Sequence, residues 1–515
     1  MTINKFFTAG IFGDCLAFLV GAVMTFAFAP FHIYPLAIIS PAVLLGLWLT
    51  VSKRRAFFRG WLYGLGMFGF GVYWVFISIH TYGDASNALS AFITGGLIAI
   101  LALYPGISGY LLNRYFPEIG NPKLLYAFPA IWVFFEWVRS WLLTGFPWLT
   151  LGYTQINSPL RGYASLLSVY GVSLVLLICS ALLVKAVLNA RQQDYKNSGF
   201  NLLAILVIFG VGTILSHIVW TKPFGAPIKV SLVQGNIPQS VKWSPESLQP
   251  TLDTYTNLTK DHWDSKIIVW PESAIPIPMH MAEDFLLNLN AIGKKHGTTF
   301  ITGIPVKLPS GDSYYNAIVT FGNGGGFYLK HRLVPFGEYV PFRKFVHGLL
   351  DILNIPMSDF VPATARATPL QAGNLQIGAY ICYEIAYPEI VLTDNAQLNM
   401  LLTVSNDAWF GKSIAQAQHL EMAQMRAVEM GRPVLFVSNN GITAIIKANG
   451  KIQSTAPPYE TVVLTDDVQP TYGKTPWQKF GIDPLLFILL ILILIAVRER
   501  RMQKASSAPV VHSSK

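Results

Sequence analysis

Three side chains able to do nucleophilic chemistry stand in short motifs of the second half of the chain. Glu272 lies in IIVWPESAIP, Lys330 in FYLKHRLVPFGEYVP and Cys382 in YICYE, and each motif ends or follows an apolar run. A thiol nucleophile needs a base to take its proton, and a carboxylate serves where burial raises its pKa. It also needs a cation or hydrogen-bond donors where negative charge develops on a tetrahedral intermediate. The three residues supply a nucleophile, a base and a cation.

Cys382 is the only cysteine between about residue 226 and residue 478, since Cys15 and Cys179 lie inside apolar runs elsewhere. In an oxidising compartment it would have no disulfide partner in this region, so a free thiol is tolerated there, which makes it a candidate nucleophile. The alternative is a buried small hydrophobe, the usual fate of a free cysteine. Its position after the β-type run Ile377 to Ile381, in a chain with the acid and lysine motifs above, favours catalysis.

The composition excludes an ordinary soluble protein. Hydrophobic residues make up 52% of the chain and charged residues 12%, whereas charged residues reach about 25% in soluble domains. The apolar excess is concentrated in eight segments, at about 11–29, 34–50, 59–79, 88–112, 125–143, 163–188, 201–220 and 482–497. Each approaches the ~20 residues that a helix needs to cross the hydrocarbon core of a bilayer. We therefore predict a multi-pass membrane protein with eight transmembrane helices.

The first apolar segment ends in Ala27-Phe28-Ala29, a small-x-small pattern like that of a signal-peptide cleavage site. Pro30 would follow the cleavage site, which is a poor position for a peptidase. Loss of one helix would also place every later basic loop on the opposite side of the membrane. We expect this segment to remain as a membrane helix.

Basic residues follow alternate apolar segments and orient them. They are Lys53, Arg54 and Arg55 after the second, Arg114 and Lys123 after the fourth, Arg191 and Lys196 after the sixth, and Arg498, Arg500, Arg501 and Lys504 after the eighth. Since basic loops stay in the cytoplasm, we expect both termini to be cytoplasmic and the large region after the seventh segment to be extracytoplasmic. These residues largely account for the net charge of +10, so the charge indicates no nucleic-acid partner.

The region between the seventh and eighth segments has a different pattern. Short β-branched runs recur at 229–233, 267–270, 299–302, 317–321, 375–381, 400–404, 433–437 and 444–447, and helical patterns intervene at 247–261, 282–296 and 414–430. This alternation predicts a layered α/β domain with a largely buried sheet. The expected organisation is a membrane domain of about seven transmembrane helices at 1–225, a catalytic α/β domain at 226–478, and a final transmembrane helix with a cytoplasmic tail at 479–515.

The Glu-Lys-Cys set in these contexts resembles the nitrilase, or carbon–nitrogen hydrolase, superfamily. With the membrane segments, the chain is similar over essentially its whole length to the bacterial apolipoprotein N-acyltransferase family. The motifs that carry the resemblance are FAFAPF, LTGFPW, QGNIPQSVKW, WPESAIP, HRLVPFGEYVPF, ICYE, SNDAWFGKS and SNNGIT. The resemblance implies a nitrilase-like αββα sandwich attached to a polytopic helical domain.

The resemblance also implies a reaction and a place. Cys382 would take an acyl chain from a membrane glycerophospholipid as a thioester, and the α-amino group of the S-diacylglyceryl cysteine of an apolipoprotein would then accept it. Glu272 would be the general base and Lys330 the oxyanion stabiliser, in a catalytic domain on the periplasmic side of the bacterial inner membrane. No cofactor is implied, and no cluster in the chain has metal-ligand spacing.

Five further residues receive supporting roles from the resemblance and from their motifs. The backbone N–H of Tyr383 would add a second oxyanion donor, and Glu338 would orient Lys330 or the incoming amine. Trp243 and Trp409 match aromatic positions that contact lipid or gate the entrance, although core or interfacial packing explains an isolated Trp equally well. Trp148, in an aromatic turn at the predicted outer interface, would form a wall of a lipid-facing cleft.

Other polar residues near these motifs have simpler explanations. Asn316 is a turn residue as readily as a site residue, Asn406 and Asp407 resemble a turn and N-cap pair, and His419 and Arg426 resemble polar positions on a helix face.

Two other functions fit parts of the pattern. A membrane-bound nitrilase-type amidase would use the same residues with water as the acceptor. A transporter or receptor would need paired inverted repeats and broken helices near the midplane, a symmetry that the eight apolar segments do not show.

The alternation of basic connections predicts the topology directly. A reporter that is active only outside the cytoplasm should be active when fused after Pro457 and inactive when fused after Lys53 or Arg500. Activity after Lys53 together with inactivity after Pro457 would reverse the orientation and exclude an extracytoplasmic lipoprotein as the substrate.

Overall fold

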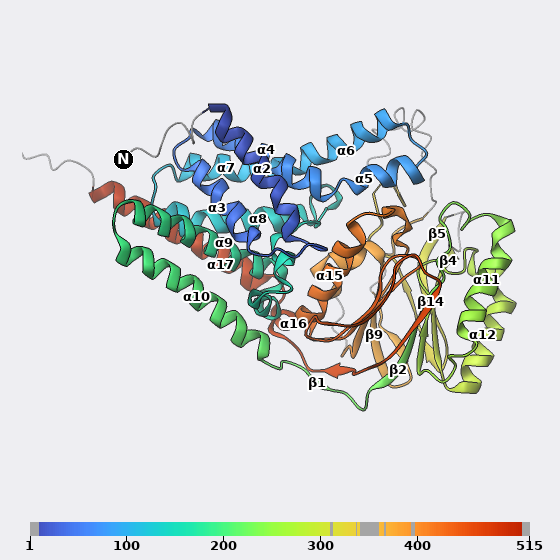
Figure 1. The fold of residues 1–515 in the computed structure, drawn as a ribbon. Helices are drawn as coiled ribbons and strands as arrows, with labels where there is room; N and C mark the ends of the chain where they lie inside the picture. Colours follow the sequence, from blue (N-terminus) through green and yellow to red (C-terminus); the bar gives the residue numbers. More distant parts are fainter. Residues whose placement is uncertain are drawn as a thin grey trace, which may run out of the picture.

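The computed structural model describes residues 10–308, 313–335, 337–339, 360–364, 367–392 and 397–506. It has a helical part and a part built on two β-sheets, which lie side by side (Figure 1). The predicted tail beyond residue 506 lies outside the described residues.

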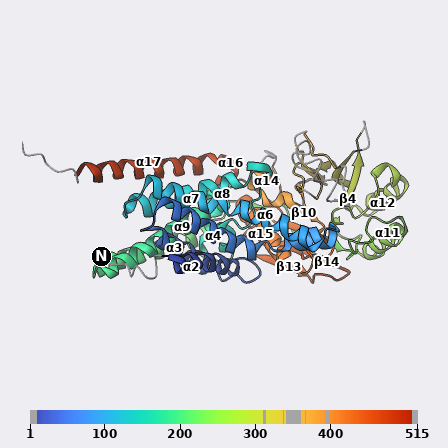
Figure 2. The ribbon, with the colours of Figure 1, turned by 90° about the horizontal axis from the view of Figure 1, so that it is seen from above.

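The helical part contains the apolar segments of the sequence. Its helices are α2 Gly10–Val23, α3 Leu36–Trp48, α4 Lys53–Gly71, α5 Trp74–Ile77, α6 Asn87–Leu101, α7 Leu103–Tyr115, α8 Phe128–Arg139, α9 Ala164–Arg191, α10 Tyr195–His217 and α17 Asp483–Ser506. Helix α17 comes from the other end of the chain and lies along this part (Figure 2). Each of the eight predicted segments overlaps one of these helices or two consecutive ones.

Four helical segments among the described residues are long and apolar enough to cross a membrane: Gly10–Ala27, Asn87–Tyr115, Pro159–Arg191 and Tyr195–His217. A fifth is obtained if Lys53–Gly71 and Trp74–Tyr82, bent by 53°, form one span, and the apolar helix Leu36–Trp48 is shorter than a full span. The helical part is therefore a multi-pass membrane region, and the number of eight crossings stays a prediction.

The globular part is an αββα sandwich, as predicted. One sheet has the order β13-β12-β11-β10-β9-β8-β6 and the other β14-β2-β3-β4-β5-β7. Helices α11 Pro245–Thr259 and α12 Glu283–His296 cover the second sheet, and α15 Ala415–Met430 covers the first (Figure 1). The strands are β2 Ile228–Gln234, β3 Ile267–Val269, β4 Thr299–Lys307, β5 Tyr314–Gly322, β6 Gly324–Gly325, β7 Phe327–Leu329, β8 Leu370–Ala372, β9 Leu375–Ile381, β10 Met400–Ser405, β11 Val434–Ser438, β12 Thr443–Ile446, β13 Ile452–Ala456 and β14 Val462–Val468.

All eight predicted runs form strands, and the three predicted helical patterns are α11, α12 and α15. Alternation along each strand explains the layers, because successive side chains of a strand point to opposite faces. Ile377, Ala379 and Ile381 of β9 enter the core between the two sheets, while Tyr380 packs on the other face against the α15 side. Strands buried on both faces read as continuous apolar runs, which is the pattern seen in the sequence.

The candidate residues follow the carboxyl ends of parallel strands. Strands β2, β3 and β4 are parallel in one sheet, and β9, β10 and β11 are parallel in the other. Glu272 follows β3, Cys382 follows β9, and Asn406 follows β10. Side chains beyond the carboxyl ends of parallel strands meet in a crevice at one edge of the sheet. The topology therefore brings together residues more than a hundred positions apart.

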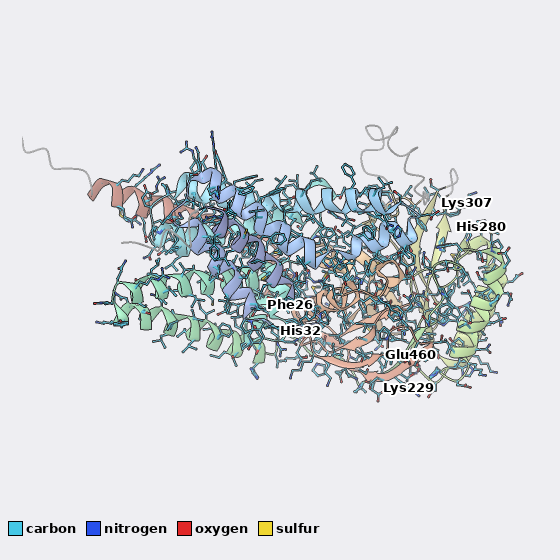
Figure 3. The ribbon with its side chains drawn as sticks, turned by 45° about the horizontal axis from the view of Figure 1, so that its top comes forward. Phe26, His32, Lys229, His280, Lys307 and Glu460 are labelled. Carbon is cyan, nitrogen blue, oxygen red and sulfur yellow. The ribbon has the colours of Figure 1, made fainter. Side chains whose placement is uncertain are left out.

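The helical part packs directly against the globular part. Trp148 Nε1 donates to Gln418 Oε1 on α15 at 2.6 Å, and Ser168 Oγ of α9 donates to Glu429 Oε1 at 2.8 Å. Phe26 and His32 lie at this junction (Figure 3), where His32 Nδ1 is 3.4 Å from Glu421 Oε1. The chain enters and leaves the globular part through a two-stranded ribbon of β1 Lys222–Pro223 and β15 Thr471–Tyr472.

A turn at Gly145 reaches from the helical part to the segment that begins with Cys382. The hydroxyls of Tyr383 and Tyr387 both donate to the carbonyl oxygen of Gly145, at 3.1 and 3.2 Å. Gly145 has φ +81, and a Cβ on it would overlap the carbonyl oxygen of Ser140. Only glycine fits this turn without strain.

Gly145→Ala should therefore destabilise the protein and displace the two tyrosines, because a non-glycine residue held in such a backbone conformation costs about 1–3 kcal/mol. The measurement is the thermal unfolding midpoint in detergent, which should fall. Gly46→Ala is the control, since nothing lies within 4 Å of a Cβ at that helical position. Equal midpoints for the two variants would show that the turn tolerates a side chain.

Candidate active site

Cys382 begins a 3₁₀ turn, Cys382–Ala386, directly after β9. Its φ is +52, a left-handed conformation that is unusual for a residue with a side chain. Such strain persists where the surrounding structure over-determines it, often at active sites. Cys382 is partly exposed, whereas the four residues that follow it are buried. The turn thus places Cys382 at the end of the strand, with its thiol largely shielded from water.

Glu272 is held by donors from three different segments. Its Oε1 accepts from Asn316 Nδ2 at 2.7 Å and from Lys330 Nζ at 3.4 Å, and its Oε2 accepts from the backbone N–H of Asn406 at 2.9 Å. Glu272 is only 7% exposed. The carboxylate is therefore fixed in place beside the lysine, as a base with a defined orientation must be.

Lys330 is a buried cation between two carboxylates. Its Nζ donates to Glu338 Oε1 at 2.8 Å and to Glu272 Oε1 at 3.4 Å, and the residue is 1% exposed. Burial by itself lowers the pKa of this ammonium, but the charges of Glu338 and Glu272 outweigh that effect and hold the pKa above its ordinary value. Lys330 is therefore a permanent positive charge and a hydrogen-bond donor.

Asn316 joins the two carboxylates, a role that sequence reasoning did not assign to it. Its Nδ2 donates to Glu272 Oε1 at 2.7 Å and to Glu338 Oε1 at 3.0 Å. Glu338 is fixed further because its Oε2 accepts from the backbone N–H of Val334 at 2.8 Å. Asn316 is an internal residue of β5. The sequence feature that could have indicated a site role for Asn316 is a polar residue inside the apolar strand run YYNAIV.

The thiol lies within electrostatic reach of this cluster. Burial is the main cause that raises the pKa of the Cys382 thiol, the Glu272 carboxylate raises it further, and Lys330 lowers it. The net pKa lies above that of a free cysteine, so the resting group is the neutral thiol. It needs a base at the moment of attack, and Glu272 is the nearby carboxylate that raises its pKa most.

Glu384 links the lysine segment to the nucleophile turn, and sequence reasoning missed it. Its carboxylate accepts from the backbone N–H groups of His331 at 2.7 Å, Arg332 at 3.0 Å and Ile381 at 2.8 Å, and from the Tyr328 hydroxyl at 2.8 Å. Glu384 is completely buried, and this burial raises its pKa. The signal was the acid two residues after the cysteine in YICYE.

Lys242 is a second buried lysine at the site that sequence reasoning missed. It is 2% exposed, and its Nζ donates to the backbone carbonyl oxygen of Glu272 at 3.0 Å. Burial lowers its pKa to about 8, against the opposing effect of Glu272 and Cys382. It precedes Trp243 in the QSVKW motif. The motif therefore contributes a support for the Glu272 loop as well as an aromatic side chain.

The three predicted aromatic residues lie in different surroundings. Trp243 is 49% exposed and Trp409 is 37% exposed. The Trp409 ring contacts Tyr82 of the helical part edge-on, with centroids 5.8 Å apart, and its carbonyl oxygen accepts from Ser78 Oγ at 2.7 Å. Trp148 is 1% exposed and stacks on Tyr383 with centroids 6.4 Å apart. Trp148 is thus buried against Tyr383, whereas Trp243 and Trp409 each have more than a third of their surface exposed.

A hollow of about 380 Å³ lies elsewhere, between α12 and the strands β4 and β5. It is lined in part by His280 and Lys307, which are labelled in Figure 3. Among the described residues, no group of His, Cys, Asp and Glu side chains is arranged to hold a metal ion.

The raised pKa of Cys382 predicts how the thiol reacts with iodoacetamide. The alkylation rate should rise with pH, with a midpoint above about 8.5, the ordinary cysteine value. Because Glu272 raises this pKa and Lys330 lowers it, Glu272→Gln should move the midpoint to lower pH and Lys330→Met to higher pH. Peptide mass spectrometry of Cys382 measures the rate. Asp253→Asn, on exposed α11, is the control, and equal midpoints in all variants would contradict the electrostatic coupling.

Two family models match this chain. Residues 20–182 match the apolipoprotein N-acyltransferase N-terminal domain, and residues 229–476 match carbon-nitrogen hydrolase. The boundary between the matches coincides with the change from helical to sheet structure. The chain also resembles yeast Nit3 from Saccharomyces cerevisiae, a member of branch 10 of the nitrilase superfamily, with 19% identity, a TM-score of 0.36, and coverage of 48% of this chain and 92% of that one.

Curated relatives match nearly the full length. The chain is 41% identical to the apolipoprotein N-acyltransferase of Coxiella burnetii over 93% of this chain and 99% of the relative. It is 40% identical to the protein of the same name from Azotobacter vinelandii over 98% of each. Helical and sheet parts are thus both shared with these relatives, and the chain belongs to the apolipoprotein N-acyltransferase family.

Proposed function

We propose that this protein transfers a fatty acyl chain from a membrane glycerophospholipid to the α-amino group of the N-terminal S-diacylglyceryl cysteine of an apolipoprotein. The observation that carries the proposal is a buried acid–lysine–acid cluster beside a strained cysteine, placed where the globular part meets the membrane helices. The names of the full-length relatives support the same activity.

In the first half-reaction, Glu272 takes the proton of the Cys382 thiol as the sulfur attacks the ester carbonyl carbon of the lipid. Lys330 Nζ and the backbone N–H of Tyr383 stabilise the oxyanion that forms on the carbonyl oxygen. The carbon–oxygen bond to the glycerol then breaks, and Glu272 returns the proton to the leaving alkoxide. The products are a lysophospholipid and an acyl thioester on Cys382.

In the second half-reaction, the amine of the apolipoprotein attacks the thioester carbon, and the same donors stabilise the new oxyanion. The carbon–sulfur bond breaks as the amide forms, and the proton lost by the amine passes through Glu272 to the sulfur. A single nucleophile serves both steps, so the lysophospholipid must leave before the amine reacts. The mechanism is therefore ping-pong.

The supporting residues have distinct roles in these two half-reactions. Glu338, bonded to Lys330 Nζ at 2.8 Å, orients the oxyanion donor. Trp243 and Trp409, with 49% and 37% of their surface exposed, contact the acyl chains at the entrance, and buried Trp148 supports the wall through Tyr383. The catalytic domain faces the periplasm, on the side where the apolipoprotein is presented.

The packing of the site against the helical part favours a lipid acceptor and donor over a water-soluble amide. The carbonyl oxygen of Gly145 accepts from two tyrosines that follow Cys382, so this segment and the helical part form one structure. Substrates that are confined to the bilayer meet a site held against the membrane helices at high effective concentration. An amidase that uses water as the acceptor would need no such arrangement.

The first test is the thioester itself. Purified protein mixed with phospholipid and no peptide should gain the mass of one acyl chain on Cys382 and release one equivalent of lysophospholipid. Cys382→Ala should show neither product and should not acylate a diacylglyceryl-cysteine peptide, because the thiol is the site of the covalent intermediate. Cys15→Ala, a change to the exposed cysteine in α2, is the matched control and should keep both activities.

The acceptor is tested with two versions of the peptide. The peptide with a free α-amino group should discharge the thioester and become acylated, whereas the same peptide with an acetylated amine should leave the thioester intact. Steady release of free fatty acid with the acetylated peptide would favour the amidase. Acylation of the free peptide by Cys382→Ala would reject Cys382 as the nucleophile.

A further inference from the structure

A buried histidine–aspartate pair lies directly beneath the nucleophile turn, and the two-step mechanism above does not use it. His419 on α15 and Asp407, which follows β10, are both completely buried. His419 Nδ1 is 3.1 Å from Asp407 Oδ1, and His419 Nε2 is 3.0 Å from the backbone carbonyl oxygen of Cys382. The pair therefore touches the main chain of the nucleophile, not its thiol.

Asp407 is fixed from two strands. Its Oδ1 accepts from Ser405 Oγ of β10 at 2.6 Å, and its Oδ2 accepts from Ser438 Oγ of β11 at 3.2 Å. A Cβ on Gly441 would come within 2.7 Å of Oδ2, so the backbone also closes around this carboxylate. Asp407 is thus a rigid acceptor for the imidazole.

Aromatic rings hold the imidazole on its other sides. The centroid of the His419 ring lies 5.1 Å from that of Phe436, 6.0 Å from that of Trp148 and 6.2 Å from that of Phe410. With Asp407 at one nitrogen and packed rings around it, the ring has one orientation. Its second nitrogen is therefore aimed at the Cys382 carbonyl oxygen by the surrounding structure.

The direction of this hydrogen bond follows from its partner. The Cys382 carbonyl oxygen and the Asp407 carboxylate both only accept, so Nε2 and Nδ1 of His419 both donate and each ring nitrogen carries a hydrogen. The Asp407 carboxylate at Nδ1 fixes the orientation of the ring. His419 thus donates to the main-chain oxygen of the nucleophile.

The oxygen that His419 holds belongs to the peptide bond between Cys382 and Tyr383. That peptide also carries the N–H of Tyr383, which is the second oxyanion donor in the proposed mechanism. The six atoms of a trans peptide are planar, and its C=O and N–H point in opposite directions. A bond to the oxygen therefore sets the direction of the N–H, on the opposite side of the peptide from α15.

We propose that His419 and Asp407 are positioning residues that aim the Tyr383 N–H at the developing oxyanion and hold Cys382 at φ +52. The proposal rests on the proposed function of Cys382 as nucleophile. It separates two properties of the site: the reactivity of the thiol, on which Asp407 acts only through its charge, and the stabilisation of the tetrahedral intermediate, which the hydrogen bond from His419 controls. The charge of Asp407 is kept when His419 is substituted.

The test compares two substitutions, each of which keeps only one of the two hydrogen-bonding positions of the imidazole. His419→Gln places an amide N–H near the position of Nε2, so the bond to the Cys382 carbonyl can form. His419→Asn is shorter and reaches only toward Asp407. Gln424→Ala is the matched control, because Gln424 is also buried on α15 and donates to a carbonyl oxygen, that of Gly450, at 2.8 Å.

Two rates are measured on each full-length variant in detergent: single-turnover thioester formation with phospholipid, and alkylation of Cys382 by iodoacetamide. Alkylation has no oxyanion, so it should stay within about twofold of the unsubstituted protein in every variant. Thioester formation should fall about a hundredfold or more in His419→Asn, comparable to the loss of one oxyanion donor. It should recover to within about tenfold in His419→Gln and be normal in Gln424→Ala.

Each contrary result overturns a defined claim. Thioester formation at the normal rate in His419→Asn, or a parallel loss of alkylation and thioester formation, would overturn the positioning role. If His419→Asn does not fold, the result for His419→Gln alone decides. A hundredfold loss of thioester formation in His419→Gln, with normal alkylation, would show that the hydrogen bond to the Cys382 carbonyl oxygen is not what matters. Failure of the proposed function is distinguishable, because then the unsubstituted protein would form no thioester on Cys382 at all.

Discussion

The site depends on one buried cation held between two buried carboxylates. Lys330 is 1% exposed and bonds Glu338 and Glu272. Removal of one partner from a buried ion pair typically costs about 3–5 kcal/mol, because the remaining charge is left uncompensated. Asn316 and the backbone N–H groups of Asn406 and Val334 complete the hydrogen bonds of both carboxylates. The cluster is rigid for this reason, and it fixes the base candidate Glu272 beside the cation Lys330.

The nucleophile turn reaches this cluster through anchors on three sides. Glu384 joins it to the segment after Lys330, the Gly145 carbonyl binds Tyr383 from the helical part, and His419 holds the carbonyl oxygen of Cys382 from α15. A cysteine at positive φ is unfavourable by itself, so a conformation of this kind needs several independent contacts to persist. The helical part supplies one of these contacts through Gly145, so it supports the turn that carries Cys382.

Much of the architecture was predictable because local patterns determine it. Continuous apolar runs of about twenty residues indicate membrane helices, and runs of four to eight β-branched residues between turns indicate buried strands. All eight predicted strands and three predicted helices of the globular part are present. The length criterion was less decisive for the membrane region. There, short or bent helices such as Leu36–Trp48 do not qualify as full spans on their own.

The sequence by itself determined the chemical groups of the site, since Glu272, Lys330, Glu338 and Cys382 stand in recognisable motifs after apolar runs. Only the tertiary structure decided the roles of Asn316, Glu384 and His419, because each acts through partners far away in the chain. Asn316 bonds Glu272 from 44 residues away, and His419 bonds Cys382 from 37 residues away. It also decided that Trp148 is buried behind Tyr383. The type of a residue determines which hydrogen bonds its side chain can form. Which of these bonds it does form depends on the tertiary structure, because the ends of strands from two sheets bring distant residues together.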